Sequence, residues 1–322
     1  MPVRNEETHL ASCLKSILKQ SYAHWELIIV NDNSTDDTAC IIEKYVQIDS
    51  RISSYDNVGS GIIDALKLAY SHASGEYITR MDGDDLMDPF KISLLLNNLL
   101  RYGVGYVATG KVEYFKEGGI GKGYQQYANW LNNLTNNKEN FNQIYRECTI
   151  PSPCWMLSRD DFEKIGAFNG NEYPEDYDLA FRMKLHGLKV VPVNKIIHYW
   201  RDHPHRATRN DPNYLDNRFL RMKVLYFLKM ELNQFQLVLW GAGSKGKMVA
   251  RQLIDVGQDF HWYTNNKNKI GQNIYGKVLQ SEDELQSLKP KNVIVAVSGS
   301  KGKKYQSPLI DKNIQHDYHF FT

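Results

Sequence analysis

The sequence predicts an α/β protein with a mostly parallel sheet, and three observations support this class. Short apolar segments with strand character alternate along the chain with segments whose apolar residues recur at helical spacing, which is the pattern of strands joined by crossover helices. Polar and acidic clusters follow directly after two of the strand segments, and a second alternation of the same kind begins near residue 235. Open α/β sheets bind ligands at the carboxyl ends of their strands, so the polar clusters are the first candidates for a site.

The first alternation covers residues 6–81. Residues 6–20 predict a helix because their leucines and isoleucine fall on one face. The run WELIIV predicts a strand over residues 25–30, and Ser34 or Thr35 is expected to cap the helix that follows. The remaining elements of this part are a strand over 51–55, a helix over 61–72 and a strand over 77–81.

The middle of the chain is less regular. Residues 104–150 are rich in Tyr, Trp and Asn and show only weak periodicity. The pattern returns after them, and the expected elements are a strand over 154–157, helices over 160–165 and 176–186, and a strand over 188–193.

The length of 322 residues predicts about two domains. We expect a first domain over residues 1–210, a connector over 211–234, and a small Rossmann-like α/β domain over 235–322. The segment 214–231 is strongly amphipathic. It is interpreted as a connecting helix that packs on one or both domains, and a helix lying on a membrane surface is the alternative.

Composition and charge narrow the class further. The chain is 42% hydrophobic and 24% charged, as in ordinary globular proteins, with no apolar run of membrane-spanning length and no signal-peptide pattern at its start. Residues 211–322 carry 16 Lys and Arg against 10 Asp and Glu. This modest excess does not indicate a nucleic-acid partner, and it leaves contact with anionic lipid as the alternative to a solvated surface. The four cysteines form no CxxC pair, which is typical of free thiols in a cytoplasmic protein.

The acidic turn (residues 82–85, DGDD) is the most prominent cluster. Asp82 and Asp84 stand two residues apart at a strand exit, where their carboxylates can share a divalent cation and its water shell. An acidic turn that only caps the next segment explains the same residues equally well. Asp32 also follows a strand, and this shared placement predicts that Asp32 and the acidic turn face one ligand.

Two further clusters leave alternatives open. Glu175 and Asp176 precede a helix, where acidic residues are favourable by about 0.3–1 kcal/mol each, and Asp176 can alternatively serve as a general base. The stretch HYWRDHPHRATR (residues 198–209) concentrates His and Arg beyond a strand. It is suited to clamping a diphosphate, and an ordinary basic loop is the alternative.

The order of these motifs resembles glycosyltransferase family 2 with its GT-A nucleotide-diphospho-sugar transferase fold. The resemblance rests on MPVRNE, LKSILKQSYAHWELIIVNDNSTDDT, ASGEYITRMDGDD and PEDYDLAFRMKLHG, and it covers about residues 1–210. DHPHRATR is further similar to a bacterial subgroup that carries a C-terminal Rossmann-like domain. The resemblance implies transfer of a sugar from a UDP- or GDP-sugar to a saccharide or lipid-linked acceptor in bacterial surface polysaccharide synthesis.

The resemblance also implies roles for single residues. Asp176 would be the base for direct displacement with inversion, while Asp84 and His203 would bind Mg²⁺ or Mn²⁺. Asp32 would contact the nucleotide base and Asp82 the ribose. The other residues implied in nucleotide-sugar binding are Pro2, Val3, Glu6, Arg80, Arg206 and Arg209. Residues 104–150 would contribute to the acceptor side, where aromatic rings suit sugars, although ordinary packing explains them as well. The expected location is the cytoplasm, with peripheral contact at the inner face of the plasma membrane as the alternative.

Three positions depart from the family pattern. Met1 stands directly before Pro2, where relatives usually have an apolar strand, so we expect the natural chain to begin upstream; an in-frame stop codon immediately before Met1 would contradict this. Arg4 replaces a Tyr that is common in relatives, and Ser152 stands where the subgroup often has His.

The loop GAGSKG (residues 241–246) follows a strand and opens a helix, as in dinucleotide-binding proteins. The next strand ends at Thr264 and Asn265, so the acidic residue that holds a ribose is missing. We therefore expect no bound NAD and interpret the loop as a packing or regulatory element. An NAD(P)-dependent oxidoreductase or sensor, and an inactive scaffold, are the alternative functions.

Overall fold

The protein is described by a computed structural model, which covers residues 1–170, 172–204, 206, 219–232, 236–285, 292–296 and 317–321. The chain divides into two compact units. The N-terminal unit comprises Met1–Asn142 and Cys148–Asn210, and the C-terminal unit comprises Gln143–Glu147 and Asp211–Thr322. The five residues Gln143–Glu147 lie within the range predicted for the first domain but pack with the C-terminal unit.

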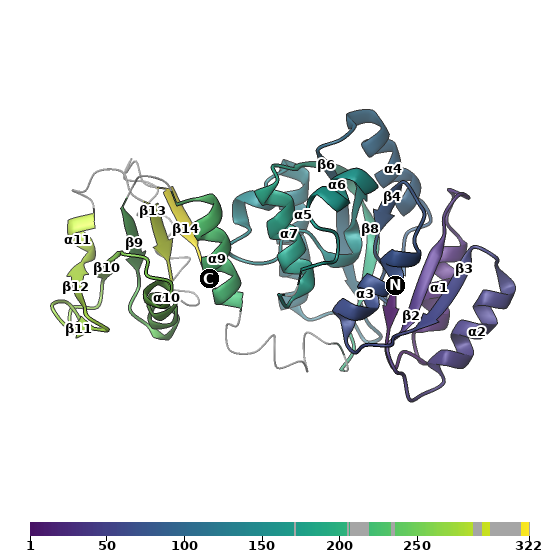
Figure 1. Ribbon diagram of the computed structural model, residues 1–322, viewed down its shortest axis with the longest axis horizontal. Coiled ribbons are helices and arrows are strands. Elements are labelled where there is room, and N and C mark those ends of the chain that lie inside the picture. Colours follow the sequence, from purple (N-terminus) through teal and green to yellow (C-terminus); the bar gives the residue numbers. More distant parts are fainter. Residues whose placement is uncertain are drawn as a thin grey trace. The chain divides into compact units, whose positions relative to one another are not determined.

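A three-stranded parallel sheet in the order β1-β2-β3 begins the N-terminal unit (Figure 1). Its strands are β1 (Pro2–Val3), β2 (Leu27–Asn31) and β3 (Ile52–Asp56), and the helices between and after them are α1 (Leu10–Leu18), α2 (Thr38–Ile48) and α3 (Ile62–His72). The apolar faces of α1 and α2 meet the sheet in a core that includes Leu14, Ile29 and Ile42.

The second helix begins later than predicted. Its first residue is Thr38, because Ser34 and Thr35 bind the segment around Asn5 instead of capping a helix. The hydroxyl of Ser34 accepts the Asn5 N–H at 3.0 Å, and the Thr35 N–H donates to Asn5 Oδ1 at 2.8 Å. Thr38 in turn accepts the Glu6 N–H at 2.7 Å. These contacts fix the loop after β1 against the carboxyl end of β2.

A second, five-stranded sheet completes the N-terminal unit in the order β4-β7-β6-β8-β5. Only the β6–β8 pairing is parallel, so this sheet is mixed and not mostly parallel as predicted. Its strands are β4 (Tyr77–Thr79), β5 (Leu86–Met87), β6 (Tyr106–Phe115), β7 (Trp155–Ser158) and β8 (Lys189–Arg201). The helices around it are α4 (Lys91–Tyr102), α5 (Lys122–Asn137), α6 (Arg159–Lys164) and α7 (Glu175–Leu185), with short 3₁₀ turns at Asn140–Gln143 and Ser152–Cys154.

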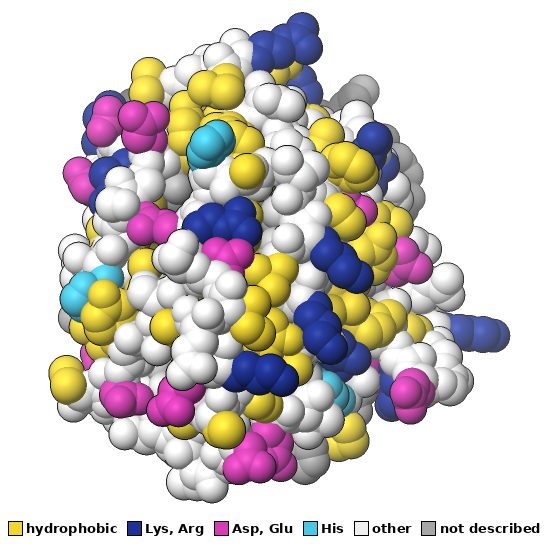
Figure 2. Space-filling model, turned by 90° about the vertical axis from the view of Figure 1, so that its right-hand side faces the viewer, with side chains coloured by type: hydrophobic (Ala, Val, Ile, Leu, Met, Phe, Trp, Pro, Cys, Tyr) yellow, Lys and Arg dark blue, Asp and Glu magenta, His cyan; other side chains and the backbone are white. Residues whose placement is uncertain are grey.

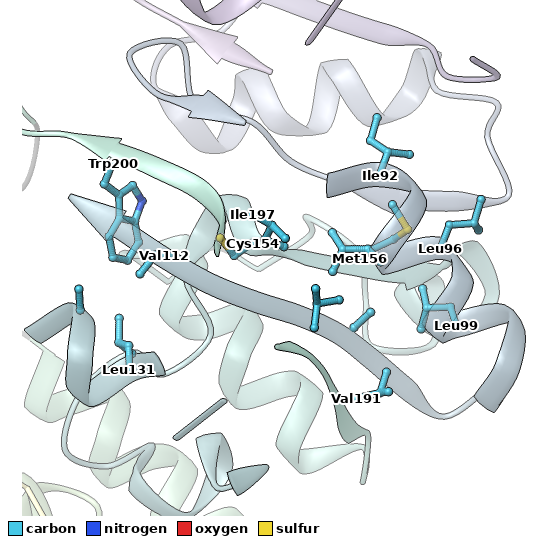
Figure 3. Close-up of a cluster of buried hydrophobic side chains, with 14 residues drawn as sticks. Ile92, Leu96, Leu99, Val112, Leu131, Cys154, Met156, Val191, Ile197 and Trp200 are labelled. Atoms are coloured by element: carbon cyan, nitrogen blue, oxygen red, sulfur yellow. The ribbon is translucent and has the colours of Figure 1, made fainter. Parts of the chain in front are cut away.

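The core of this sheet explains the weak pattern of residues 104–150. Val112 of β6 packs with Leu131 of α5 and with Ile197 and Trp200 of β8 (Figure 3). Four consecutive residues of β6, at positions 107–110, are buried, so this half of the strand does not alternate between apolar and polar. A strand buried on both faces lacks the period-2 signal that a half-exposed strand gives.

The C-terminal unit contains a six-stranded sheet in the order β11-β12-β10-β9-β13-β14, in which only β11 runs antiparallel. Its strands are β9 (Leu237–Trp240), β10 (His261–Thr264), β11 (Asn273–Ile274), β12 (Lys277–Ser281), β13 (Asn292–Val295) and β14 (Asp317–Phe320), and its helices are α9 (Phe219–Met230), α10 (Ser244–Asp255) and α11 (Glu282–Leu285). The GAGSKG loop joins β9 to α10. A Cβ at position 246 would collide with the Gly241 carbonyl oxygen, so glycine is required where the helix meets the loop.

Helix α9 covers the described part of the amphipathic segment, and residues 214–218 of that prediction lie outside the described residues. Leu220, Val224 and Phe227 are buried, and the Phe227 ring lies 5.8 Å from that of Tyr145. This burial within the C-terminal unit favours a packed helix over a membrane-surface helix. In the described part of the chain, no helix combines the length and apolar character needed to cross a bilayer.

Candidate active site

The acidic turn connects β4 to β5 and packs against the end of β1. A Cβ at Gly83 would lie 2.9 Å from Cγ1 of Val3 and 3.5 Å from Cγ of Glu6. Glycine therefore lets the turn approach Val3, which is itself buried. The structure thus brings Val3 and Glu6, two of the predicted site residues, next to the acidic turn, and Pro2 precedes Val3 in β1.

Asp84 and His203 meet at this turn. Oδ2 of Asp84 lies 3.0 Å from Nε2 of His203, and both side chains are largely buried. Burial alone raises the pKa of Asp84, but the His203 hydrogen bond and the charge of Arg206 lower it below its ordinary value. Asp84 is therefore ionised at neutral pH. The two residues lie 119 positions apart in the sequence, and the pairing of β5 with β8 brings their segments together.

Arg80 bridges the acidic turn and the start of α7. Its Nε donates to Oδ1 of Asp82 at 3.0 Å, and its Nη1 donates to Oε1 of Glu175 at 2.6 Å. The guanidinium is buried, which by itself lowers its pKa, but the carboxylates of Asp82, Glu175 and Asp176 raise it. The residue thus holds two acidic motifs together that lie about ninety positions apart in the sequence.

Asp176 lies beside this bridge in the first turn of α7. Burial and the neighbouring Glu175 raise its pKa to about 7, against the lowering effect of Arg80. The Tyr177 N–H donates to its Oδ1 at 2.7 Å. A carboxylate with a pKa near the operating pH suits a general base. Oε2 of Glu175 is buried and has no hydrogen-bond partner among the described residues, so an acceptor atom is available next to Asp176.

Asp32 and Glu6 occupy the edge of the site formed by β1 and β2. Asp32 is buried, and its carboxylate accepts the Asn57 side chain at 2.7 Å and the Gly61 N–H at 3.0 Å. The residue therefore orders the loop over residues 57–61, a role that the sequence did not predict. Burial, Asp84 and Asp82 raise the pKa of Glu6 to about 8, which places Glu6 within the electrostatic reach of the acidic turn.

Arg206 lies next to the acidic turn and Tyr114. Its guanidinium carbon lies 5.6 Å from the centroid of the Tyr114 ring. Burial lowers the pKa of Arg206, but Asp85, Tyr114 and Asp84 raise it above its ordinary value. Arg209, the other arginine predicted for this site, lies outside the described residues.

Sequence reasoning missed several residues that contact the site. The ring of His9 lies 4.8 Å from that of His203. Arg201 donates to the Asp84 carbonyl at 2.8 Å and to Ser12 Oγ at 3.0 Å. The sequence offered a weak signal for Arg201, which falls in the basic stretch, and none for His9 or Ser12.

Asp85 belongs to a different environment from its neighbour Asp84. It is buried, with Oδ2 at 2.9 Å from Nε2 of His198, while Nδ1 of His198 lies 3.3 Å from Nζ of Lys91. All three side chains are less than 2% exposed. Burial lowers the pKa of Lys91 and of His198, and burial together with Asp84 raises the pKa of Asp85. We call these three residues the buried triad.

The donor atoms at the turn fit a divalent cation of the Mg²⁺ or Mn²⁺ type. Within the described residues no three His, Cys, Asp or Glu side chains are grouped as a complete metal site. Asp84 and His203 offer two converging donors, and Mg²⁺ sites commonly use one or two protein ligands with substrate phosphates and water completing the shell. The residues present therefore suit a cation that binds together with a phosphorylated substrate.

Comparison with known sequences identifies relatives of the N-terminal unit. The sequence pattern of Glycosyl transferase family 2 matches residues 1–166. Glycosyltransferase GlyA of Streptococcus pneumoniae is 26% identical over 208 residues, which are 62% of this chain and 30% of GlyA. The Escherichia coli protein named UDP-Glc:alpha-D-GlcNAc-diphosphoundecaprenol beta-1,3-glucosyltransferase WfgD is 32% identical over 108 residues, which are 33% of this chain and 42% of WfgD. The matched regions thus span less than half of either relative.

Solved structures show the same fold. S. aureus TarS 1-349 in complex with UDP-GlcNAc superposes with a TM-score of 0.56 at 15% identity, covering 79% of this chain and 71% of that one. Mannosyltransferase PcManGT from Pyrobaculum calidifontis, in complex with GDP-Man and Mn²⁺, gives a TM-score of 0.52 at 17% identity, covering 78% and 66%. These likenesses confirm the predicted GT-A fold. Because the family pattern covers about half of its residues, this chain belongs to glycosyltransferase family 2.

Proposed function

We propose that this protein is a metal-dependent, inverting glycosyltransferase. It moves a sugar from a nucleotide diphosphate sugar to a saccharide or lipid-linked acceptor in the synthesis of bacterial surface polysaccharide. The observation that carries the proposal is the Arg80 bridge between Asp82 and Glu175. This bridge keeps a base of raised pKa, Asp176, beside the turn where Asp84 meets His203.

The donor occupies the acidic turn and the ends of β1 and β2. Asp32, with Pro2, Val3 and Glu6 around it, faces the nucleotide base, and Asp82 faces the ribose. Arg80 takes part by fixing Asp82, and Arg206 and Arg209 stabilise the diphosphate. The complexes of TarS with UDP-GlcNAc and of PcManGT with GDP-Man support a donor of this class. The name of WfgD, which includes a diphosphoundecaprenol acceptor, supports a lipid-linked acceptor.

The transfer step needs one base and one stabilised leaving group. Asp176 accepts the proton of the acceptor hydroxyl, whose oxygen forms a bond to the anomeric carbon of the donor sugar. The bond from that carbon to the diphosphate oxygen breaks, and its electron pair leaves with the nucleoside diphosphate. This direct displacement inverts the anomeric centre. Asp84 and His203 would hold Mg²⁺ or Mn²⁺, and the bound ion would supply Lewis-acid stabilisation of the leaving diphosphate.

The acceptor approaches from the aromatic side of the site. The rings of Tyr114 and Tyr124 lie 5.0 Å apart, and Tyr114 lies 5.0 Å from Trp200. Trp200 is buried in the core, whereas Tyr114 and Tyr124 are partly exposed, and exposed aromatic faces suit the apolar faces of sugar rings. Burial raises the pKa of Tyr114 to about 12, so its hydroxyl stays protonated and can donate a hydrogen bond to an acceptor.

The proposed location is the cytoplasm, with peripheral contact at the inner face of the plasma membrane. Figure 2 looks onto the side of the N-terminal unit that carries α1 and α2, and it shows Lys and Arg side chains beside exposed hydrophobic ones, with Asp and Glu side chains among them. Lys15 of α1 and Ile48 of α2 are exposed, and so is Lys19, which follows α1 directly. Such a mixture suits an anionic lipid surface. Sedimentation with anionic vesicles, but not with neutral ones, is the expected result, and equal recovery with both would contradict the proposal.

A donor screen tests the function directly. Purified protein is incubated with UDP- and GDP-sugars, with Mn²⁺ or with EDTA, and released nucleotide is measured. We expect release from one donor class, abolished by EDTA and restored by excess Mn²⁺. The anomeric configuration of the product, read by NMR, tests inversion. Full activity in EDTA would remove the metal from the proposal, and a retained configuration would remove the single-displacement step.

A further inference from the structure

The buried triad joins the last residue of the acidic turn to two other elements. The proposed transfer step uses none of its three side chains. Its members come from three elements: Asp85 from the turn, Lys91 from the start of α4, and His198 from β8. Buried charged groups are expensive unless they are paired and hydrogen-bonded. Because burying these groups is costly, we looked for a function of the buried triad in the neighbouring candidate site.

The hydrogen bonds of the triad define one arrangement of its protons. Nζ of Lys91 donates to the Pro153 carbonyl and lies 3.3 Å from Nδ1 of His198. With Lys91 as an ammonium, which has only donors, Nδ1 accepts and the imidazole proton sits on Nε2. That proton points to Oδ2 of Asp85 at 2.9 Å. Lys91 thereby sets the tautomer with which His198 holds Asp85.

The other oxygen of Asp85 extends the chain to the proposed metal ligands. Oδ1 accepts the Arg201 N–H at 2.8 Å, and the Arg201 side chain donates to the Asp84 carbonyl at 2.8 Å. Arg201 ends β8, two residues before His203. The buried Asp85 carboxylate thus holds Arg201, and Arg201 in turn binds the main chain of Asp84. Asp85 is therefore linked to both segments that carry the Asp84–His203 pair.

We propose that Lys91, His198 and Asp85 form a positioning network that holds Asp84 and His203 in register for cation binding. The network acts through Arg201 and touches neither substrate nor cation. The inference rests on the proposed function, because it gives Asp84 and His203 the role of ligands. Partners behind metal ligands typically contribute 10- to 100-fold to metal affinity or activity, which sets the expected size of the effect.

His198 offers the sharpest test, because one substitution can keep the hydrogen bonds and another can remove them. Glutamine has an amide N–H near the Nε2 position and an oxygen for Lys91, whereas leucine has neither. We expect His198→Leu to weaken Mn²⁺ binding by about 10- to 100-fold, measured by the EPR signal of free Mn²⁺ in the presence of the donor's nucleoside diphosphate. His198→Gln should stay within about threefold of the parent protein, as expected if hydrogen bonding to Asp85 carries the effect.

Lys91→Met gives a second variant with a matched control in the C-terminal unit. Lys223 is also buried and donates to a main-chain carbonyl, that of Arg146 at 3.0 Å. Both substitutions remove a buried ammonium, so both should lower the thermal midpoint. Only Lys91→Met should weaken Mn²⁺ binding and raise the Mn²⁺ concentration needed for half-maximal turnover. Lys91→Met carries the test alone if His198→Leu does not fold.

The outcomes separate this inference from the proposed function. If the parent protein binds Mn²⁺ and His198→Leu and Lys91→Met bind it equally well while folded, the network has no positioning role and the metal site stands. Loss of Mn²⁺ binding in His198→Gln as large as in His198→Leu also overturns the inference. If the parent protein binds no Mn²⁺ at all, the metal role of Asp84 and His203 fails, and the positioning role fails with it.

Discussion

The two units each place a loop at the carboxyl end of a short strand, and the two loops differ in what surrounds them. The acidic turn after β4 lies among titratable groups, of which Glu6 and His203 come from distant segments and Arg80 stands two residues before the turn. At the GAGSKG loop after β9, the tight contact is between backbone and backbone, where Gly246 meets Gly241, and Lys269 donates to the Ala242 carbonyl at 2.6 Å. The shape of a loop therefore does not by itself indicate a site, and the titratable groups around the N-terminal loop make it the candidate site.

Among the variants that test this difference between the two loops, Asp84→Asn should reduce activity the most. Asp84→Asn removes the negative charge that pairs with His203 and that the cation requires. Since metal stabilisation of a leaving group amounts to several kcal/mol, we expect kcat/KM to fall by about 10⁴-fold. Steady-state assays with Mn²⁺ measure this. Sugar transfer at the parent rate would show that the acidic turn is no more functional than the glycine loop.

The second effect concerns Asp176. Asp176→Asn cannot accept a proton, so kcat should fall by about 10³-fold, which is within the usual range for a general base. Donor binding should persist, because the residue is proposed to meet the acceptor and not the nucleotide. Calorimetry with the donor sugar nucleotide checks the binding. A fully active variant would remove Asp176 from the mechanism.

The pH dependence of transfer should follow the raised pKa of Asp176. Only the deprotonated carboxylate accepts a proton, so kcat/KM should rise with pH, about tenfold per unit below pH 7, and level off above it. With an ordinary aspartate pKa near 4, the rate would already be flat at pH 6. The residual rate of Asp176→Asn should lack this rise, which separates Asp176 from other titrating groups such as Glu6.

The glycine loop should respond only through stability. Gly246→Ala forces a methyl group against the Gly241 carbonyl oxygen, and overpacking of this kind costs about 1–3 kcal/mol. Gly243 is the matched control, because a Cβ there meets nothing within 4 Å and its φ is −77°; Gly243→Ala should change stability by less than about 0.5 kcal/mol. Thermal unfolding of both variants measures this. An equal loss in both would refute the packing role of position 246.

The smallest expected effect is that of NADH on the parent protein. The sequence lacks an acidic residue at the end of β10, where Thr264 and Asn265 stand, so calorimetry should show no heat of binding. A clear binding isotherm would reverse the comparison, because the C-terminal loop would then be a ligand site in its own right.

The site was predictable where function depends on residue types at fixed spacing. Asp82, Asp84 and Asp176 stand in motifs whose order alone points to the family. The partners of these residues were not predictable in the same way. Arg80 carries no sequence signal that distinguishes a buried bridge from a ligand contact, and nothing in the sequence distinguishes Lys91 from a surface lysine. Its burial follows from the way α4 packs on β7 and β8.

The fold, like the site, has features that the sequence predicted and features that it did not. Alternating apolar segments determine that the chain forms α/β units, because periodicity in sequence becomes a face in space. The antiparallel pairings of the second sheet and the burial of β6 follow from contacts between residues far apart in the chain, which local periodicity does not encode. The sequence by itself therefore determined the family and predicted the acidic turn and Asp176 as candidate site residues. Only the tertiary structure decided that Asp84 meets His203, that Arg80 links Asp82 to Glu175, and that Asp85 faces inward, because each of these depends on strand pairing and burial.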